Sequence, residues 1–430
     1  MTGPRRPLVP DSLFADRVLD ASAGPARVLS LRTGVRDAVS FRGSIDTSPD
    51  LAACDDLTQA VLSDLLDKGT RLRDRFAIAE ALDGRGASLS FYSDGLRMGF
   101  SGRALREDLP AVLALAAEAL RQPSLDAEEV DKAVTRAVAG VRRARESTAT
   151  QASGALARRL FPSDHPNYVL EPSAELDYLS GITAEAVRQY HADRVGSDAL
   201  TITVVGDLPD AGVEGVVAEA FGGWAATDRQ PTFSSAALGA APGRAVVEIP
   251  DRRNLDVRLG HAVAVRRQSD DFLPTYAGVY ALGGNFSSRL MQTVRDEQGL
   301  TYGVHALLRA SSDDHDGVVR VGISLSQENL ERGIEAVRHE VRQFVEEGVT
   351  AEALAPTQTT LAGQHVVALA TTGGIAARLL VNAQRGFDVG YLDRYPDLVR
   401  ALTPEAVTAA VREHVRPDEL HVAVAGTLPA

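Results

Sequence analysis

The segment 282–303, LGGNFSSRLMQTVRDEQGLTYG, carries two side chains whose chemistry suits the binding of a peptide, Arg295 and Tyr302. Arginine supplies a rigid fork of N–H donors and tyrosine supplies a hydroxyl. Both groups can hold peptide carbonyls or a developing oxyanion. Residue types alone also allow an exposed ion pair of Arg295 with Asp296 or Glu297, and half-buried packing of Tyr302.

A short helix followed by a strand must position this pair. Gly299 is suited to end the helix in a left-handed cap that reverses the chain. A residue one turn before Gly299 and a residue three positions after it can then meet in space. Ser287 and Ser288 are explained by helix capping and need no nucleophilic role.

A pair of histidines at helical spacing is absent from the sequence, and Glu335 with His339, at i and i+4, is expected to be a surface pair. No two of the nine histidines are three, four or five residues apart: His165, His191, His261, His305, His315, His339, His365, His414 and His421. The densest ligand-like cluster is 313–316, DDHD, which is followed by Gly317. Because Asp and Gly favour turns, we expect a solvated hairpin turn there. The sequence also lacks a G-x-S-x-G elbow, a Walker loop and a C-x-x-C pair.

The composition is that of an ordinary globular protein of more than one domain, with 430 residues, 44% hydrophobic and 24% charged. A formal net charge of -13 argues against a general nucleic-acid-binding surface. The single cysteine, Cys54, cannot form an internal disulfide. With no signal-peptide pattern and no apolar run of membrane-spanning length, the expected location is cytoplasmic, without a membrane partner.

The chain contains an internal duplication. Segment 182–209 aligns without a gap to 402–429, with 11 identities in 28 positions. Both copies read as a Thr N-cap, an amphipathic helix, a turn and a closing strand. Segments 27–43 and 245–260 also resemble each other, as pairs of short strands.

Locally paired strands followed by runs of helices predict an α+β fold in two homologous halves. Further strand pairs are expected at 87–91 with 96–101 and at 300–309 with 318–326, and helices at 109–120 and 330–345. Small residues, Pro and Gly replace periodic patterns in 225–243. The sequence therefore predicts an N-terminal domain over 1–224, a linker over 225–243 and a C-terminal domain over 244–430.

The order of the glycine pair, Phe286, SSRL, Val294-Arg295, Gly299-Leu300 and Tyr302 resembles the C-terminal signature of the M16 (pitrilysin or insulinase-like) zinc metallopeptidases. The resemblance extends over roughly 28–428. It implies the M16 fold, in which each half is a mostly antiparallel sheet packed with helices. The length is similar to that of the short, M16B-type members, which assemble from two chains. In this family the residues matching Arg295 and Tyr302 hold the substrate backbone opposite a zinc site.

The zinc motif of the family, H-x-x-E-H on a helix, has no counterpart in this chain. Anchoring the comparison on the family-like Lys68-Gly69-Thr70 places Ala60 and Asp64 at the histidine positions and Ser63 at the glutamate position. Ala139 or Gly140 stands where the family has its third ligand. One carboxylate falls short of the three protein ligands of a catalytic zinc site. We therefore expect no metal in this chain.

The resemblance implies a metal-free, substrate-binding subunit of a heterodimeric zinc endopeptidase that is inactive alone. A partner M16 chain with intact H-x-x-E-H would supply the zinc, and peptides or precursor leader segments would be cleaved. The region matching the long glycine-rich loop of inactive mitochondrial processing subunits holds only Gly283-Gly284. The alternative is a non-proteolytic structural or peptide-binding protein, similar to the core subunits of respiratory complexes.

Overall fold

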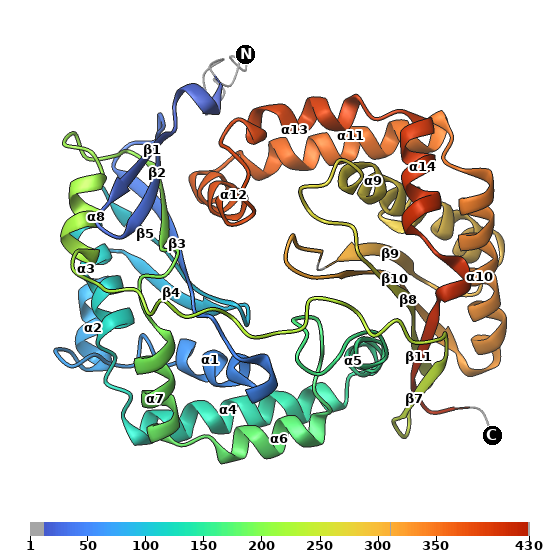
Figure 1. The fold of residues 1–430 in the computed structure, drawn as a ribbon, viewed down its shortest axis with the longest axis horizontal. Helices are drawn as coiled ribbons and strands as arrows, with labels where there is room; N and C mark the ends of the chain where they lie inside the picture. Colours follow the sequence, from blue (N-terminus) through green and yellow to red (C-terminus); the bar gives the residue numbers. More distant parts are fainter. Residues whose placement is uncertain (1–12, 310, 429–430) are drawn as a thin grey trace, which may run out of the picture. The chain divides into compact units, whose positions relative to one another are not determined.

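Each half of the sequence contributes the strands of one β-sheet. The computed structural model describes residues 13–309 and 311–428 and is shown in Figure 1. The first sheet has the order β1-β2-β6-β3-β5-β4 and the second has the order β7-β11-β8-β10-β9. The first contains β1 Leu19–Ala23, β2 Ala26–Arg32, β3 Ala38–Asp46, β4 Ser88–Ser93, β5 Arg97–Leu105 and β6 Thr201–Gly206. The second contains β7 Arg244–Glu248, β8 Asn254–Val263, β9 Val304–Arg309, β10 Gly317–Ser326 and β11 His421–Gly426.

The two sheets repeat one topology. The first sheet has β1 as an additional edge strand. In each sheet the last strand of the half is inserted between two earlier strands of that half. It runs parallel to one of them, in the pairs β2–β6 and β7–β11, and antiparallel to the other, in β3–β6 and β8–β11. The remaining pairs are antiparallel. The predicted α+β fold with two similar halves is therefore confirmed.

The duplicated ends also agree in detail. α7 Ala184–Arg194 is capped by the Thr183 hydroxyl, which accepts the Ala186 N–H over 3.2 Å. α14 Pro404–His414 is capped in the same way by Thr403, which accepts the Ala406 N–H over 3.2 Å. Each helix is followed by the closing strand, β6 or β11.

The described residues form two compact units that differ from the two contiguous segments predicted from the sequence. Unit 1 takes residues 13–138, 178–232 and 364–395, and unit 2 takes 139–177, 233–363 apart from residue 310, and 396–428. Each unit therefore contains helical segments from both halves of the sequence. Some segments belong to the unit built mainly from the other half of the sequence, because they pack against the sheet of that unit. Hydrophobic periodicity shows that such a helix has an apolar face, but not which sheet the face packs against.

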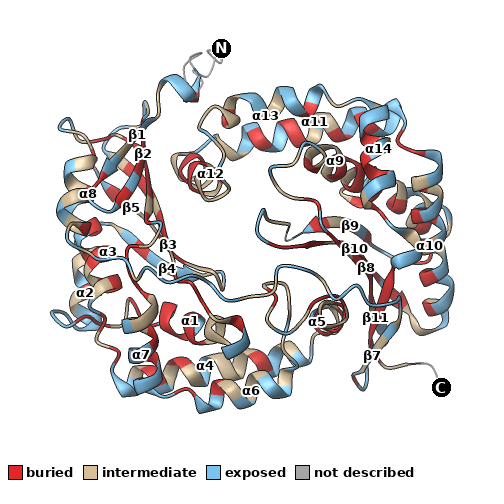
Figure 2. Cartoon of the chain, viewed as in Figure 1, coloured by how far each residue is buried: buried red, intermediate tan, exposed pale blue. Residues whose placement is uncertain are grey.

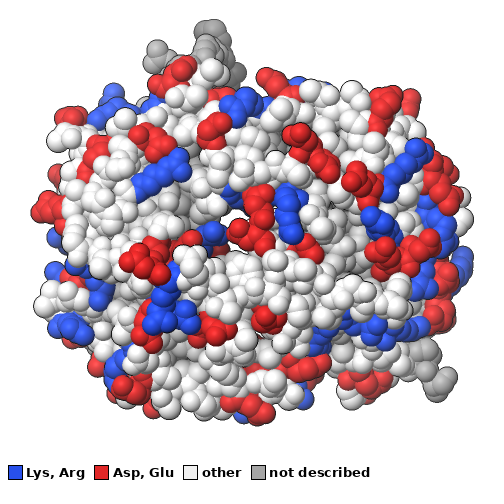
Figure 3. All heavy atoms as spheres, in the orientation of Figure 1, with Lys and Arg blue, Asp and Glu red and all other residues white. Residues whose placement is uncertain are grey.

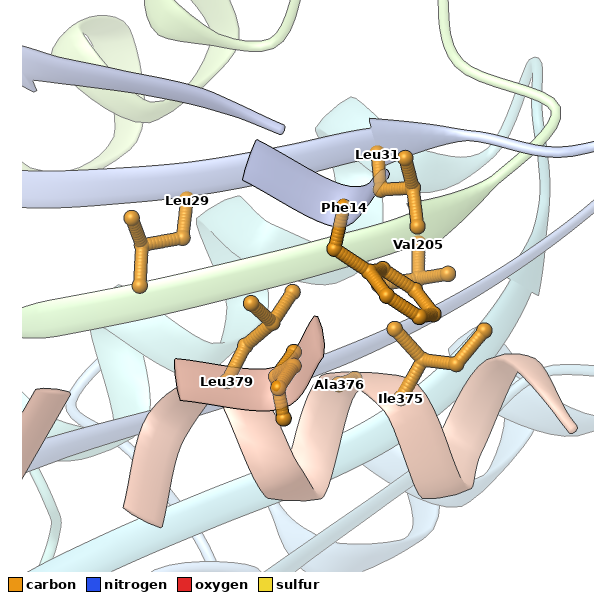
Figure 4. Close-up of a cluster of buried hydrophobic side chains, with 8 residues drawn as sticks. Phe14, Leu29, Leu31, Val205, Ile375, Ala376 and Leu379 are labelled. Atoms are coloured by element: carbon orange, nitrogen blue, oxygen red, sulfur yellow. The ribbon is translucent and has the colours of Figure 1, made fainter. Parts of the chain in front are cut away.

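The core of unit 1 includes a helix from the second half of the sequence. It contains α1 Asp55–Ser63, α2 Arg75–Asp83, α3 Leu109–Arg121, α7, α8 Glu214–Phe221 and α12 Thr372–Gln384. α12 comes from the second half of the sequence, yet it packs on β6 and β3. Its buried side chains Ile375, Ala376 and Leu379 meet Leu29, Leu31, Val205 and Phe14, as Figure 4 shows.

Unit 2 contains the reciprocal helix. Its helices are α5 Thr148–Leu160, α9 Phe272–Gly283, α10 Leu330–Glu347, α14 and the π-helix Met291–Glu297. α5 comes from the first half and lies on β7, β8 and β11, where Leu156 and Leu160 pack with Ala423. In Figure 2 the strands of this sheet are largely buried, whereas α10 has an exposed side.

Four helices contain residues of both units: α4 Ala127–Arg145, α6 Pro172–Gly181, α11 Ala351–Ala368 and α13 Tyr391–Arg400. Short 3₁₀ turns occupy Phe14–Asp16, Leu51–Ala53, Gln327–Asn329 and Pro417–Glu419. Within the described ranges, no single helix is long and apolar enough to cross a membrane. One pair, α11 with α12, reaches that length and composition only when taken together across a bend of 112°.

The 313–316 cluster forms the expected turn between β9 and β10, but half of it is buried rather than solvated. His315 and Asp316 are 7% and 8% exposed. The Asp316 carboxylate accepts the Ala237 N–H over 3.0 Å and pairs with Arg266 over 3.0 Å. The turn thus fastens part of the 225–243 segment to unit 2.

His165 lies against this turn. It is 2% exposed, stacks on Phe161 with ring centroids 4.3 Å apart, and meets the edge of His315 at 5.5 Å. Its Nδ1 accepts the Asn167 N–H over 2.9 Å. Burial and the neighbouring His315 lower the pKa of His165 to about 4.

Candidate functional site

The α1 helix carries the positions at which the M16 resemblance expects zinc ligands. Ala60 and Asp64 are exposed, and Asp64 is the C-cap of the helix. Ser63 is buried, and its hydroxyl donates to the Ala60 carbonyl over 2.8 Å. The one polar group at the glutamate position is therefore engaged by its own helix. These three side chains do not form a site that fits zinc.

A buried glutamine next to these positions holds α1 in place. Gln59 is 0% exposed, and its amide hydrogen-bonds the hydroxyls of Thr47 and Ser93. Its carbonyl oxygen also accepts the Gly95 N–H over 3.1 Å. Burying an amide is tolerated when its hydrogen bonds are made, so this network fixes the helix against β3 and the β4–β5 turn.

The later helix supplies no further ligand, because Ala139 and Gly140 on α4 carry no ligating atoms. In the described part of the chain, one group of at least three His, Cys, Asp or Glu side chains has ligand atoms close enough to hold an ion. It consists of Asp271, Glu413 and His414, with the atoms within 4.8 Å of one another. This group lies in unit 2 and shares no residue with α1 or α4.

The segment that carries Arg295 is a seven-residue π-helix, Met291–Glu297. π-helical turns are rare and are often found at functional sites. Met291 and Val294 are buried on its inner side. The Leu300 N–H bonds the Val294 carbonyl over 3.1 Å, and Gly299 has φ 62°, so the helix ends in the left-handed cap predicted from the sequence.

Arg289 anchors the beginning of this helix to α10. Its guanidinium bonds Glu340 over 3.0 Å, Glu347 over 2.6 Å and Gln343 over 3.2 Å. These carboxylates raise the pKa of Arg289. A fork held by three partners on one helix leaves little freedom. Arg295 is therefore displayed from a segment that is fixed at both ends.

The turn before the helix depends on Asn285. Its side-chain oxygen accepts the Ser287 N–H over 3.0 Å and the Ser287 hydroxyl over 2.9 Å. The Ser288 hydroxyl donates to the Asn285 carbonyl over 2.5 Å. The serines thus stabilise the turn by donating toward Asn285, and neither caps the π-helix with its side chain.

Arg295 and Tyr302 both project from the surface of unit 2. The Arg295 Nη1 donates to Asp296 Oδ1 over 3.0 Å, and the Arg295 side chain is 38% exposed. Tyr302 is 98% exposed. Among the described residues no hydrogen bond joins Arg295 to Tyr302, so the meeting of the two side chains stays a prediction. Both donors are open to a ligand.

A second group of polar side chains on unit 2 was not singled out from the sequence. Arg258, His305, Arg309 and Arg320 lie on one face of the second sheet, on β8, β9 and β10. The sequence signal was partial: His305 and Arg309 fall on one face of the strand, but Leu307 stands between them. The neighbouring strands that complete the group are distant in sequence, so only the strand register brings it together.

Comparison with known proteins gives the family. Residues 181–361 match the family model described as "Peptidase M16 inactive domain", and residues 61–164 match the model described as "Insulinase (Peptidase family M16)". The chain belongs to the peptidase M16 family. The match over 61–164 lies in the first half of the chain, and the match over 181–361 runs from α7 and β6 at the end of the first half into the second half as far as α11.

Relatives of this chain include a protein of Streptomyces coelicolor named as an uncharacterized zinc protease. It is 23% identical over 390 residues, which cover 89% of this chain and 83% of the relative. A Bacillus subtilis protein, also named as an uncharacterized zinc protease, is 21% identical over 323 residues, covering 74% and 75% of the two chains.

Solved structures share the fold. The peptidase M16 inactive domain from Pseudomonas fluorescens superposes with a TM-score of 0.83 at 22% identity, covering 96% of this chain and 98% of the other. The periplasmic protease PqqL from Escherichia coli gives a TM-score of 0.77 at 13% identity. That match covers 100% of this chain and 48% of PqqL, so this M16 chain corresponds in fold to about half of that protein.

Proposed function

We propose that this chain is the metal-free, substrate-binding subunit of a two-chain M16 zinc endopeptidase. The observation that carries the proposal is the contrast between two places in the molecule. The α1 positions hold Ala60, Ser63 and Asp64, which cannot bind a catalytic zinc ion. The π-helix and the loop that follows it, by contrast, hold a partly exposed arginine, Arg295, and a nearly fully exposed tyrosine, Tyr302.

The geometry supports peptide binding at this turn. The Arg295 guanidinium and the Tyr302 hydroxyl are donors that suit peptide carbonyls. Among the described residues, the restraint on Arg295 is a partly exposed pair with Asp296, and such pairs contribute little to stability. A substrate can therefore recruit Arg295 at small cost. A partner M16 chain with intact H-x-x-E-H would contribute the zinc and the water that it activates.

The expected ligand is a peptide or an unfolded precursor segment. Nucleic acid is a poor candidate at a net charge of -13. On the face shown in Figure 3, acidic and basic side chains are interspersed without a continuous basic tract. We also propose a cytoplasmic location, since the single cysteine gives no disulfide that needs an oxidising compartment.

The test is to co-express this chain with an M16 chain that has the intact zinc motif, purify both and measure peptide cleavage. We expect a stable complex, no cleavage by this chain alone and cleavage by the pair. Binding of peptide by the pair without any cleavage would favour the non-proteolytic, peptide-binding alternative. Chelator-sensitive cleavage by this chain alone would contradict the metal-free assignment.

A further inference from the structure

The register of the second sheet gathers three arginines and one histidine on one face. Gly322 of β10 pairs with Arg258 of β8 on one side and with His305 of β9 on the other. Arg320, two residues before Gly322, pairs with Leu307, and Arg309 pairs with Val318. Paired residues, and residues two apart on a strand, point to the same face. Arg258, His305, Arg309 and Arg320 therefore share a face, and we call them the cationic cluster.

The absence of a side chain at residue 322 makes room for the centre of this cluster. A Cβ placed on Gly322 would lie 2.6 Å from the His305 Nε2 and 3.4 Å from the Arg258 Nη1. The imidazole thus lies across the glycine, with the Arg258 guanidinium beside it. Two nitrogen-bearing groups from β9 and β8 converge over β10.

The cluster lies at the border of the part of the sheet that α5 covers. Helix α5 packs over β7, β8 and β11, where the residues beneath it are small, such as Ala423 and Ala425. Arg258 is 6% exposed and is held to α5 by Ser153, whose hydroxyl lies 3.1 Å from its Nε. His305 and Arg309, on the edge strand β9, are exposed. In the cluster, Arg258 is therefore held rigidly, whereas the side formed by His305 and Arg309 is open to solvent.

Its charges are poorly compensated within the described chain. Arg258 pairs with Asp256 over 3.2 Å. Arg309 and Arg320 have no carboxylate within ion-pair distance among the described residues, and the Arg320 Nε is buried without a hydrogen-bond partner. Burial and the nearby Arg258 and Arg309 lower the pKa of Arg320 to about 10, and burial with Arg258 and Arg320 lowers the pKa of His305. Buried charge without a partner is costly, which makes such groups candidates for binding a ligand.

We propose that the cationic cluster is a subsite for a carboxylate of the bound peptide, either an acidic side chain or the C-terminal carboxylate. Arginine forks bind carboxylates with strong, often bidentate hydrogen bonds. The inference rests on the proposed peptide-binding function. The position of the cluster next to the Arg295 and Tyr302 turn also supports it, because Tyr302 lies two residues before β9. The Thr301 hydroxyl joins that loop to the Ser324 carbonyl of β10 over 2.7 Å.

The experiment measures binding to this chain alone by fluorescence anisotropy. The probes are short labelled peptides with blocked ends and a central Glu-Glu pair, the same peptides with Gln-Gln, and the Gln-Gln peptides with a free C-terminal carboxylate. We expect the Glu-Glu peptide, the free-carboxylate peptide or both to bind about tenfold tighter than the blocked Gln-Gln peptide. The advantage should shrink between about 0.05 M and about 0.5 M salt. Comparison of the two carboxylate peptides identifies the source that the subsite prefers.

Two variants locate the effect. Arg320→Gln and Arg309→Gln should each remove most of the preference for the carboxylate while leaving the affinity for the blocked Gln-Gln peptide unchanged. Arg332→Gln, an exposed arginine on α10, is the matched control and should keep the preference. Circular dichroism confirms that each variant is folded. Equal affinity for acidic and neutral peptides, or full preference in both cluster variants, would overturn the subsite.

The same variants separate this inference from the proposed function. Loss of cleavage by the complex with Arg295→Ala, together with equal cleavage of acidic and neutral peptides, would retain the proposed function and reject the subsite. Acidic preference in binding without cleavage by any complex would retain the subsite and reject the protease role.

Discussion

The guanidinium of Arg295 bonds the carboxylate of its neighbour Asp296 over 3.0 Å, and both side chains are partly exposed. An exposed pair of this kind contributes on the order of 0.5 kcal/mol to stability. The pair holds Arg295 loosely and leaves it available to a substrate.

Replacement of Arg295 or Tyr302 should therefore separate activity from stability. We expect Arg295→Ala and Tyr302→Phe to change the free energy of unfolding by less than about 0.5 kcal/mol. Each should lower kcat/KM of the two-chain complex by about a hundredfold or more, because each removes a donor from the substrate. Asp296→Asn, which frees Arg295, should keep full activity. Thermal unfolding and peptide cleavage measure the two effects, and wild-type cleavage in both Arg295→Ala and Tyr302→Phe would exclude the clamp.

Restoring the two histidine positions should create zinc binding without activity. Ala60 and Asp64 are exposed, so Ala60→His with Asp64→His is compatible with the fold and places two imidazoles at i and i+4. We expect zinc affinity at least about tenfold above that of the parent chain, but no cleavage, since Ala139 and Gly140 supply no third ligand. Both proteins carry His414→Ala to remove the Asp271, Glu413 and His414 group. Equal zinc affinity in the parent and the double-histidine variant would contradict the account of α1.

The buried His165 should make unit 2 sensitive to acid. Its pKa is about 4 in the folded chain, whereas an unfolded histidine titrates near 6.5, so the unfolded state binds the proton more readily. The contribution of His165 to the free energy of unfolding is constant above about pH 6.5. It falls by on the order of 2 kcal/mol as the pH drops from about 6.5 toward 4. Denaturant unfolding at several pH values measures this loss.

The matched pair of variants for this effect is His165→Asn and His339→Asn. Asparagine keeps an acceptor near the Asn167 N–H but does not titrate, so the loss of stability between about pH 6.5 and 4 should be smaller in His165→Asn. The free energy of unfolding should still change with pH in this variant, because other histidines also have lowered pKa values: His191, His261, His305, His365 and His421. His339 is exposed, and its replacement should leave the slope unchanged. An unchanged slope in His165→Asn would show that the ring is not a source of the acid sensitivity.

Removal of Arg320 should stabilise the chain. This guanidinium is half-buried, lacks a carboxylate partner among the described residues and lies near Arg258 and Arg309. Arg320→Gln relieves that repulsion, so we expect the free energy of unfolding to rise by about 1 kcal/mol and Tm by a few degrees. Arg332→Gln should stay within about 0.5 kcal/mol of the parent. A lower Tm for Arg320→Gln would show that Arg320 has a structural partner.

Much of the fold could be predicted from local patterns. Threonine caps, alternating apolar residues and the repeated segment at 182–209 and 402–429 led to the correct fold class and helix-strand order. The exchange of α5 and α12 between the sheets could not be predicted, because both helices have apolar faces that would suit either sheet. Only side-chain fit decides such packing, as between Ile375 and Leu31.

The candidate site was predicted in part. The left-handed cap at Gly299 follows from residue type. The π-helix depends on how Met291 and Val294 are buried, which the sequence pattern does not reveal. The burial of His315 and Asp316 depends on contacts with the distant Ala237 and His165, and the cationic cluster depends on strand register.

The central claim is that two chains share one active site, and a titration tests it most directly. A fixed amount of an M16 chain with intact H-x-x-E-H is mixed with increasing amounts of this chain, and the initial rate of peptide cleavage is measured. The account predicts little cleavage at the start, a rise that saturates at equal amounts of the two chains, and no rise with Arg295→Ala. Full cleavage by the zinc-bearing chain alone, unchanged by addition of this chain, would contradict it.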